Sequence, residues 1–144
     1  MKAVDSNVLI YARRVERPQH AIAEVVLRSL ATGAEQWVLP WPCVYEFLRV
    51  VTHPRVFRPP TPLSEAWGAV ELLLNSPSVV PIAEGARHRE VLRDLLHAVP
   101  LTGNVLHDAH IAALLIEHGV DEIITADEDF RRFPGLKVTN PFRP

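Results

Sequence analysis

The chain has 144 residues, of which 48% are hydrophobic, and a formal net charge of −2. This length and apolar content suffice for one globular domain with a substantial core, and they exclude an intrinsically disordered chain. The nearly neutral charge indicates no particular polyanionic partner. Cys43 is the only cysteine, which excludes an intrachain disulfide and is typical of a reducing compartment.

The N-terminus has no long apolar stretch behind a basic start, so we expect no signal peptide. No run approaches the roughly 20 apolar residues that a membrane-spanning helix needs. We therefore expect a cytoplasmic protein with no membrane segment.

Short predicted strands alternate with predicted helices along the chain. Strands are expected at residues 2–4, 37–39, 78–81, 122–125 and 136–138, and helices at 8–12, 20–31, 42–51, 63–74, 86–98, 104–118 and 127–132. Pro42 suits the first turn of its helix, and Gly119 suits the left-handed position after a helix. The alternation predicts βαβ units, with a parallel sheet of about four or five short strands and helices on both faces.

Acids follow two of these strands. Asp5 comes directly after the apolar pair Ala3-Val4, and Asp127 closes the string Glu122-Ile123-Ile124-Thr125-Ala126-Asp127. The carboxyl ends of parallel strands form the ligand crevice of an open α/β sheet, so these two carboxylates are expected to meet there. Charged groups leave water only with a partner, and a metal ion is the simplest one.

Both acids also have a purely structural interpretation. Asp5-Ser6-Asn7 is good turn and cap chemistry, and Thr125 with Glu128 matches a helix capping box. Capping does not explain three consecutive acids at 127–129, because like charges this dense repel unless they share a cation.

Two further acids lie on predicted helices. Asp108 shares a helical stripe with Ile111, Ala112 and Leu115, so its carboxylate is expected at the head of a buried face. Glu46 points nearly opposite the apolar stripe of its own helix. Periodicity alone therefore predicts that Glu46 is a surface residue.

Other catalytic motifs are absent. His107 and His110 are three residues apart, as in some zinc sites, but no matching Cys or second His pair stands at zinc spacing. The chain has no Gly-x-Gly-x-x-Gly, no Walker A loop and no nucleophile elbow. Nucleotide-cofactor binding and a Ser-His-Asp triad are therefore not predicted.

Taken together, these segments resemble the PIN-domain ribonucleases of the VapC toxin type. The resemblance is carried by Val4-Asp5-Ser6-Asn7-Val8-Leu9-Ile10, by Glu46 on its proline-started helix, by Asp108-Ala109-His110-Ile111-Ala112-Ala113-Leu114 with Glu117-His118-Gly119, and by Thr125-Ala126-Asp127-Glu128-Asp129-Phe130 with Phe133-Pro134-Gly135-Leu136. The motifs span nearly the whole chain, and their order, spacing and the total length all agree with that family.

The resemblance implies an α/β fold with three α/β/α layers and a single PIN domain over residues 1–144. It implies an acidic catalytic quartet, with the first and third acids as metal ligands: Asp5, Glu46, Asp108 and Asp127. It further implies that Asn7 and Thr125 support the site by hydrogen bonding and that Asp129 is an accessory acid. On this basis Glu46 belongs to the site despite its periodicity.

All-oxygen ligands favour Mg²⁺ or Mn²⁺ over zinc. Such a site is suited to hydrolysing RNA phosphodiester bonds, so we expect a metal-dependent endoribonuclease. Arginines offer bidentate phosphate contacts, and the candidates for holding the RNA backbone are Arg13, Arg14, Arg49, Arg55 and Arg58.

The resemblance also implies a small cognate antitoxin, an RNA substrate and a homodimer. Two alternatives remain open from the sequence. One is a PIN nuclease of RNA processing outside a toxin–antitoxin system, and the other is a non-catalytic binding module that keeps the fold.

Overall fold

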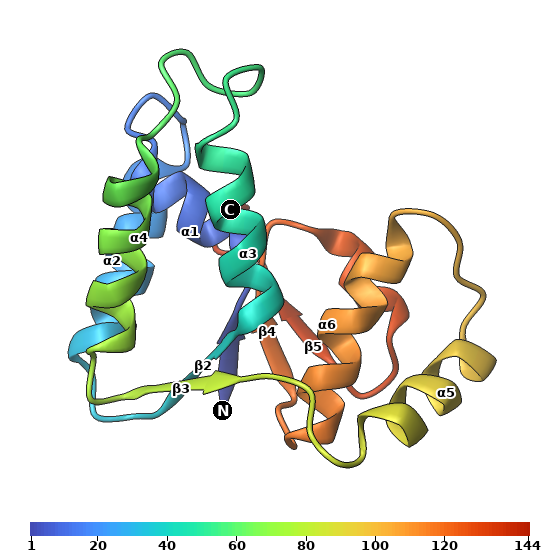
Figure 1. The fold of residues 1–144 in the computed structure, drawn as a ribbon. Coiled ribbons are helices and arrows are strands. Elements are labelled where there is room, and N and C mark those ends of the chain that lie inside the picture. Colours follow the sequence, from blue (N-terminus) through green and yellow to red (C-terminus); the bar gives the residue numbers. More distant parts are fainter.

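A computed structural model describes residues 1–144 as a five-stranded parallel sheet flanked by helices (Figure 1). The strands are β1 (Lys2–Val4), β2 (Trp37–Pro40), β3 (Val79–Ile82), β4 (Glu122–Ile124) and β5 (Lys137–Thr139). Their order across the sheet is β3-β2-β1-β4-β5, and every neighbouring pair is parallel. The expected α/β class and parallel sheet are confirmed.

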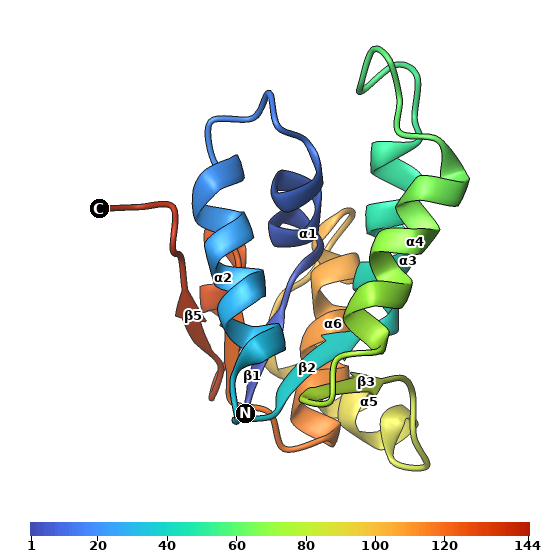
Figure 2. The ribbon, with the colours of Figure 1, turned by 90° about the vertical axis from the view of Figure 1, so that its left-hand side faces the viewer.

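Each face of the sheet is covered by its own set of helices (Figures 1 and 2). One core draws on α1 (Ser6–Arg13), α2 (His20–Thr32), α3 (Trp41–Val51) and α4 (Leu63–Leu74). The other draws on α5 (His88–Ala98), α6 (Val105–Glu117) and the short 3₁₀ helix η1 (Glu128–Arg132). This gives the three α/β/α layers.

The strands feed both cores through their alternating side chains. In β1, Ala3 packs into the core beneath α5 and α6, whereas Val4 packs into the core beneath α1 to α4. In β4, Ile123 and Ile124 divide in the same way. A strand buried on both faces has no polar alternation, which explains why these strands read as short apolar runs.

Most predicted boundaries hold within two residues, and one local prediction needs correction. The capping box of Thr125 and Glu128 does not form, because Thr125 is not the N-cap of η1 and its hydroxyl donates to Asp5. The side chain of Asp127 caps η1 by accepting from the backbone N–H of Asp129 at 2.8 Å. Gly119 adopts the expected left-handed conformation, with φ of 69°.

The strand order places a topological switch point beside β1. The chain proceeds from β1 to β2 and β3 on one side, then crosses to β4 and β5 on the other. The connections diverge here, which leaves a crevice at the carboxyl ends of β1 and β4. Asp5 and Thr125 are the residues that directly follow these two strands. No helix is both long and apolar enough to cross a bilayer.

Candidate metal centre

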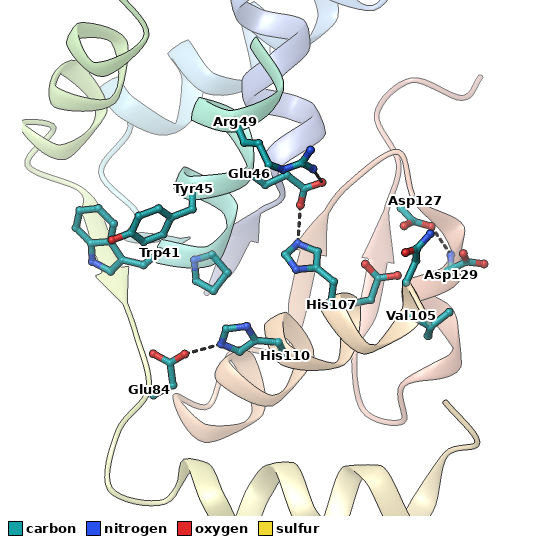
Figure 3. Close-up of a pocket in the computed structure, with 13 residues that line it drawn as sticks. Trp41, Tyr45, Glu46, Arg49, Glu84, Val105, His107, His110, Asp127 and Asp129 are labelled. Carbon is teal, nitrogen blue, oxygen red and sulfur yellow. Dashed lines mark hydrogen bonds and ion pairs between the residues drawn. The ribbon is translucent and has the colours of Figure 1, made fainter. Parts of the chain in front are cut away.

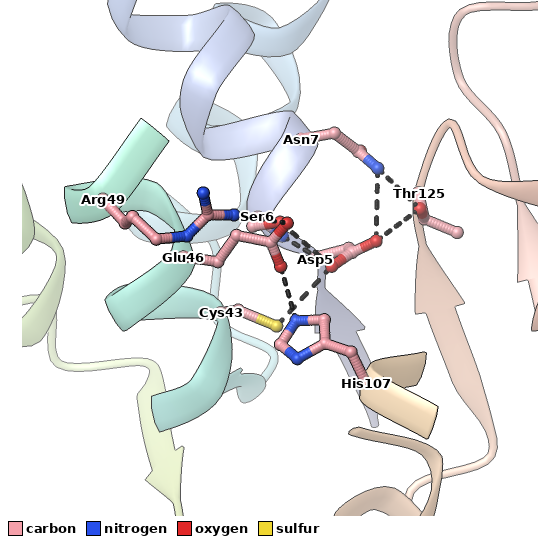
Figure 4. A network of polar contacts seen from close by, with 8 residues as sticks. All are labelled: Asp5, Ser6, Asn7, Cys43, Glu46, Arg49, His107 and Thr125. Atoms are coloured by element: carbon pink, nitrogen blue, oxygen red, sulfur yellow. Dashed lines mark hydrogen bonds and ion pairs between the residues drawn. The ribbon is translucent and has the colours of Figure 1, made fainter. Parts of the chain in front are cut away.

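Asp5 is fixed at the end of β1 by a dense set of hydrogen bonds (Figure 4). Its backbone N–H continues the sheet by donating to the carbonyl of Ile124 at 3.1 Å. Its Oδ1 accepts from the Ser6 N–H at 2.7 Å and thereby caps α1. Its Oδ2 accepts from the Thr125 hydroxyl at 2.7 Å and from Asn7 Nδ2 at 3.2 Å. The Asp5 carboxylate is only 4% exposed, and these hydrogen bonds hold it in one orientation.

Asn7 and Thr125 connect this network to the loop after β4. Asn7 Nδ2 donates to Thr125 Oγ1 at 2.9 Å, and Asn7 Oδ1 accepts from the Ala126 N–H at 3.1 Å. Thr125 Oγ1 also accepts from the Asp127 N–H at 2.9 Å. The loop that presents Asp127 is therefore fastened to the start of α1, about 120 residues away in sequence.

A cleft of about 770 Å³ is lined by Glu46, Asp108 and Asp127, among others (Figure 3). Thirteen residues line it and only three are hydrophobic. Five acids are among them: Glu46, Glu84, Asp108, Asp127 and Asp129. Arg49 is the only arginine in the lining. A polyanion entering such a cleft meets strong repulsion unless cations neutralise the acids.

Three of these acids lie close enough to share an ion. Asp108 comes from the first turn of α6, and Asp127 and Asp129 from the loop and first turn of η1. One carboxylate oxygen of each lies within 4.8 Å of the other two. An all-oxygen set of this kind is a ligand set that could hold a divalent ion.

Electrostatic strain in the cleft is concentrated on Asp108. Burial raises its pKa to about 7, and repulsion from Asp127 and Asp5 adds to the effect. Burial likewise raises the pKa of Asp5, against the lowering effect of its hydrogen bond from Thr125. A cation that neutralises these carboxylates would relieve that cost, so the acids fit a bound metal ion.

Glu46 faces the cleft, and the prediction from helical periodicity that it is a surface residue is wrong. Its Oε2 lies 2.6 Å from His107 Nε2, and its Oε1 lies 4.0 Å from the Arg49 guanidinium (Figure 4). The hydrogen bond to His107 lowers the pKa of Glu46 and raises the pKa of the imidazole. The polar face of α3 meets the N-terminal turns of α6, so a residue opposite the apolar stripe is half-buried in the cleft rather than fully exposed.

The carboxylate oxygens of Asp5 are not part of the closest triad, although the sequence singled Asp5 out as a metal ligand. Asp5 does not line the cleft, but it is near enough to Asp108 to raise the pKa of that carboxyl. The structure therefore brings Asp5, Glu46, Asp108, Asp127 and Asp129 to the same end of the sheet. It does not bring them all to one point.

The five candidate arginines are spread over the molecule. Arg49 lines the cleft, whereas Arg13, Arg14, Arg55 and Arg58 do not. Arg13 and Arg14 each form a 2.7 Å ion pair with a glutamate. Arg49 is thus the one arginine of the set that stands beside the acids.

His107 is the cleft residue that the sequence interpretation undervalued. The i, i+3 spacing pairs His107 with His110, but the two imidazoles bind different glutamates. Its position next to Asp108 was the available signal, since neighbours of an acid at a helix start share its surroundings.

Comparison with known proteins identifies the family to which this site belongs. The family model described as PIN domain matches residues 2–136. The chain belongs to the PIN domain family. The resemblance to PIN-domain ribonucleases of the VapC type is thereby confirmed, and so is the three-layer fold.

Similar proteins share the fold over almost the whole length. Ribonuclease VapC43 of Mycobacterium tuberculosis is 39% identical over 141 residues, which cover 98% of this chain and 95% of that protein. The structure of VapBC2 from Rickettsia felis, bound to a DNA fragment from its promoter, matches with a TM-score of 0.70 at 17% identity and covers 96% of this chain and 97% of that chain. A toxin–antitoxin complex from Klebsiella pneumoniae matches with a TM-score of 0.62 at 20% identity, with 100% of both chains covered.

Proposed function

We propose that this PIN-domain protein is a cytoplasmic endoribonuclease that uses Mg²⁺ or Mn²⁺ to hydrolyse RNA phosphodiester bonds. It acts as the toxin of a toxin–antitoxin pair. The observation that carries the proposal is the convergence of Asp5, Asp108, Asp127 and Asp129 at the switch point of the sheet. It occurs in a chain that is 39% identical to a relative named as a VapC ribonuclease.

The acids themselves favour a hard divalent cation. Asp5 and Asp108 would serve as ligands, and Asp127 and Asp129 lie close enough to Asp108 to complete the set. No cysteine and no imidazole stands within the closest acid triad, which favours Mg²⁺ or Mn²⁺ over softer ions there. A bound ion of this kind supplies a lowered pKa for a coordinated water and charge neutralisation for a phosphate oxygen.

Side chains of the protein hold the carboxylates of the site in place and influence their protonation. Ser6, Asn7 and Thr125 hold the Asp5 carboxylate in place, so it needs no reorganisation when substrate binds. The proton that Asp108 retains near neutral pH leaves its carboxyl group when a cation is captured. Glu46 orients water at the rim of the cleft while His107 fixes its direction.

Arg49 is the proposed contact to the RNA backbone. It projects from the last turn of α3 beside the acids, and its side chain is 66% exposed. A guanidinium in this position offers paired donors to a phosphate and partly offsets the negative cleft.

The proposed partners follow from the solved relatives. The Klebsiella pneumoniae structure is a toxin–antitoxin complex, and its fold matches this chain over its full length. By analogy we propose that a small antitoxin covers the acidic cleft of this protein, that the toxin forms a homodimer, and that residues 1–144 work as one PIN domain.

The proposal is tested with the purified protein and a fluorescently labelled single-stranded RNA. We expect cleavage with Mg²⁺ or Mn²⁺, none after chelation by EDTA, and a loss of at least ~100-fold for Asp5→Asn. Asp121→Asn is the matched control, because Asp121 is an exposed acid whose side chain is 81% accessible. Circular dichroism checks that both variants are folded.

Cleavage by Asp5→Asn at the parental rate would overturn the catalytic assignment, as would cleavage in EDTA. Expression in bacteria tests the toxin role separately. Growth should stop with the parental chain, continue with Asp5→Asn, and recover when the neighbouring antitoxin gene is expressed with the parental chain.

A further inference from the structure

A second cluster of ligand-type side chains lies at the other end of the cleft, apart from the acid triad. Glu84 comes from the loop after β3, His88 from the first turn of α5, and His110 from the middle of α6. One ligand atom of each lies within 4.8 Å of the other two. His110 Nε2 and Glu84 Oε1 are 2.5 Å apart, and the two imidazole centroids are 5.7 Å apart (Figure 3 shows Glu84 facing His110).

A buried carboxylate with one unsatisfied oxygen lies behind this cluster. The Glu117 side chain is only 5% exposed, and its Oε2 makes no hydrogen bond. His88 Nδ1 is also buried without a hydrogen bond and lies 3.5 Å from that oxygen. A buried nitrogen and a buried oxygen without hydrogen bonds lower the stability of the folded protein. A ligand-binding role for the imidazole would explain why this pair is present.

The loop after β3 is shaped around Glu117. Its Oε1 accepts from the Arg87 N–H at 3.1 Å. A Cβ on Gly85 would lie 2.5 Å from that same oxygen, so a larger residue there would require the Glu117 carboxylate to shift. His118 adds a contact of 2.8 Å between its Nε2 and the Ala83 carbonyl. The site is therefore built by several residues that make no use of the acid triad.

We propose that Glu84, His88 and His110 form a second metal site that prefers Zn²⁺ over Mg²⁺, with Glu117 as the residue that orients His88. Two imidazoles and one carboxylate are a donor set typical of zinc. Ligand atoms of a tetrahedral zinc ion stand ~3.3 Å apart, given bond lengths of about 2.0–2.1 Å. To hold a zinc ion, Glu84 Oε1 and His110 Nε2 would have to move apart from 2.5 Å, and all three ligand atoms already lie within 4.8 Å of one another.

The arrangement around His88 is that of a carboxylate–histidine–metal unit. Glu117 Oε2 lies 3.5 Å from Nδ1, and a hydrogen bond formed between them on metal binding would fix the tautomer and leave Nε2 to bind the ion. Three protein ligands leave one tetrahedral position open. Glu84 and His110 line the cleft, so that position is reached from the cleft by water or by an oxygen of whatever occupies it.

The proposed site pairs different histidines from those that the sequence spacing suggests. The i, i+3 pair of His107 and His110 does not bind one ion, because His107 is committed to Glu46. His88 and His110 are 22 residues apart and come together only because α5 packs against α6. The proposal does not depend on RNA cleavage, since it uses none of the four acids of the proposed catalytic site.

The test is a Zn²⁺ titration of the full chain, stripped of metals and then held in excess Mg²⁺ to occupy the acidic cleft. We expect one equivalent of Zn²⁺ to bind by calorimetry and to raise the melting temperature. The variants His88→Gln and His110→Gln should each weaken Zn²⁺ binding by ~100-fold or more. Co²⁺ substitution should give the visible spectrum of a tetrahedral nitrogen–oxygen site in the parent only.

The matched control is His97→Gln, because His97 is exposed on α5 and bonds only the Arg93 carbonyl. It should bind Zn²⁺ as the parent does. Glu117→Gln keeps an acceptor for Arg87 but loses the charge, so it should weaken binding by about 10–100-fold. A purely structural role for Glu117 would leave the Zn²⁺ affinity unchanged.

Three outcomes would overturn the proposal: no Zn²⁺ binding in excess Mg²⁺, unchanged affinity in the two ligand variants, or Zn²⁺ binding that is lost on Asp108→Asn alone. The last result would place the zinc in the acidic cleft. If a histidine variant does not fold by circular dichroism, Glu84→Gln replaces it, because the Glu84 side chain is about half exposed.

Discussion

Thr125 is the residue on which the geometry of the acidic cleft depends most. Its hydroxyl donates to Asp5 Oδ2 and accepts from Asn7 Nδ2 and from the Asp127 N–H. The side chain is fully buried, so water does not replace these bonds. One oxygen atom therefore fixes two of the candidate ligands relative to each other.

Replacing Thr125 by Val keeps the shape and removes that oxygen. We expect the free energy of unfolding to fall by about 1–3 kcal/mol, because Asp5, Asn7 and the Asp127 N–H each lose a partner. RNA cleavage should fall as well, since Asp5 is no longer held. Denaturant unfolding and the cleavage assay measure the two effects. Thr125→Ser retains the hydroxyl and should recover most of both; if Ser behaves like Val, the methyl group rather than the hydrogen bonds is what matters.

Asp108 should make the metal-free protein less stable as the pH rises. Its folded pKa of about 7 lies above the ordinary value of 3.8, so the folded state binds more protons than the unfolded state between these values. Stability therefore declines across this window, and the full penalty is present above it.

Asp108→Asn stays neutral and escapes that penalty. Without metal and above pH 7, we expect the variant to be more stable than the parent by ~1–2 kcal/mol, a figure discounted for partial solvent screening. The difference should vanish near pH 4. Urea unfolding in EDTA at both pH values provides the measurement, and equal stability at high pH would contradict the proposed strain.

At the scale of elements, α6 joins the cleft to one of the two cores. Its first turns present His107 and Asp108 to the cleft, while Ile111, Leu114 and Leu115 are almost fully buried. The helix thus anchors the acid by packing rather than by hydrogen bonds from its own end.

Leu114→Ala tests that anchoring. We expect a loss of about 2–5 kcal/mol in the free energy of unfolding, because a fully buried leucine leaves a cavity. Ile116→Ala, on the same helix, removes a side chain that is 39% exposed and should cost less than ~1 kcal/mol. Thermal and denaturant unfolding compare the two, and similar losses at both positions would show that α6 is not packed as described.

At the scale of the whole molecule, the cleft joins elements from both ends of the chain. Asp5 follows β1, Glu46 lies on α3, and Asp127 and Asp129 come after β4. An ion bound by the triad of Asp108, Asp127 and Asp129 would therefore link α6 to the loop after β4, next to Asp5 and Glu46.

Saturating Mg²⁺ should stabilise the folded chain globally. At 100 times its dissociation constant the ion adds about 2.7 kcal/mol, which corresponds to a rise of roughly 10 °C in melting temperature for a domain of this size. Differential scanning fluorimetry with and without Mg²⁺ measures it. The Asp108→Asn variant should show a much smaller rise in melting temperature. If millimolar Mg²⁺ leaves the melting temperature of the parent unchanged, the metal centre is contradicted.

The fold was largely predictable because its signals are local. Apolar runs such as Ile123-Ile124 locate the strands, and Pro42 and Gly119 mark a helix start and a helix end. These signals give the element boundaries to within a few residues. The position of Asp5 at a strand end, and of Asp108 at the head of a buried stripe, also follows from short segments. Buried parallel strands and helix starts leave these marks regardless of the rest of the chain.

Residue patterns alone predicted the α/β class, the parallel sheet and the family, since these depend on periodicity and on motifs within a few residues. The packing of the helices, by contrast, determines how Glu46 meets the cleft and that four of the five candidate arginines do not line it. It alone brought His88 to His110. The reason is physical: which helix face meets another helix, and which distant side chains share a space, depends on how both cores pack around the sheet.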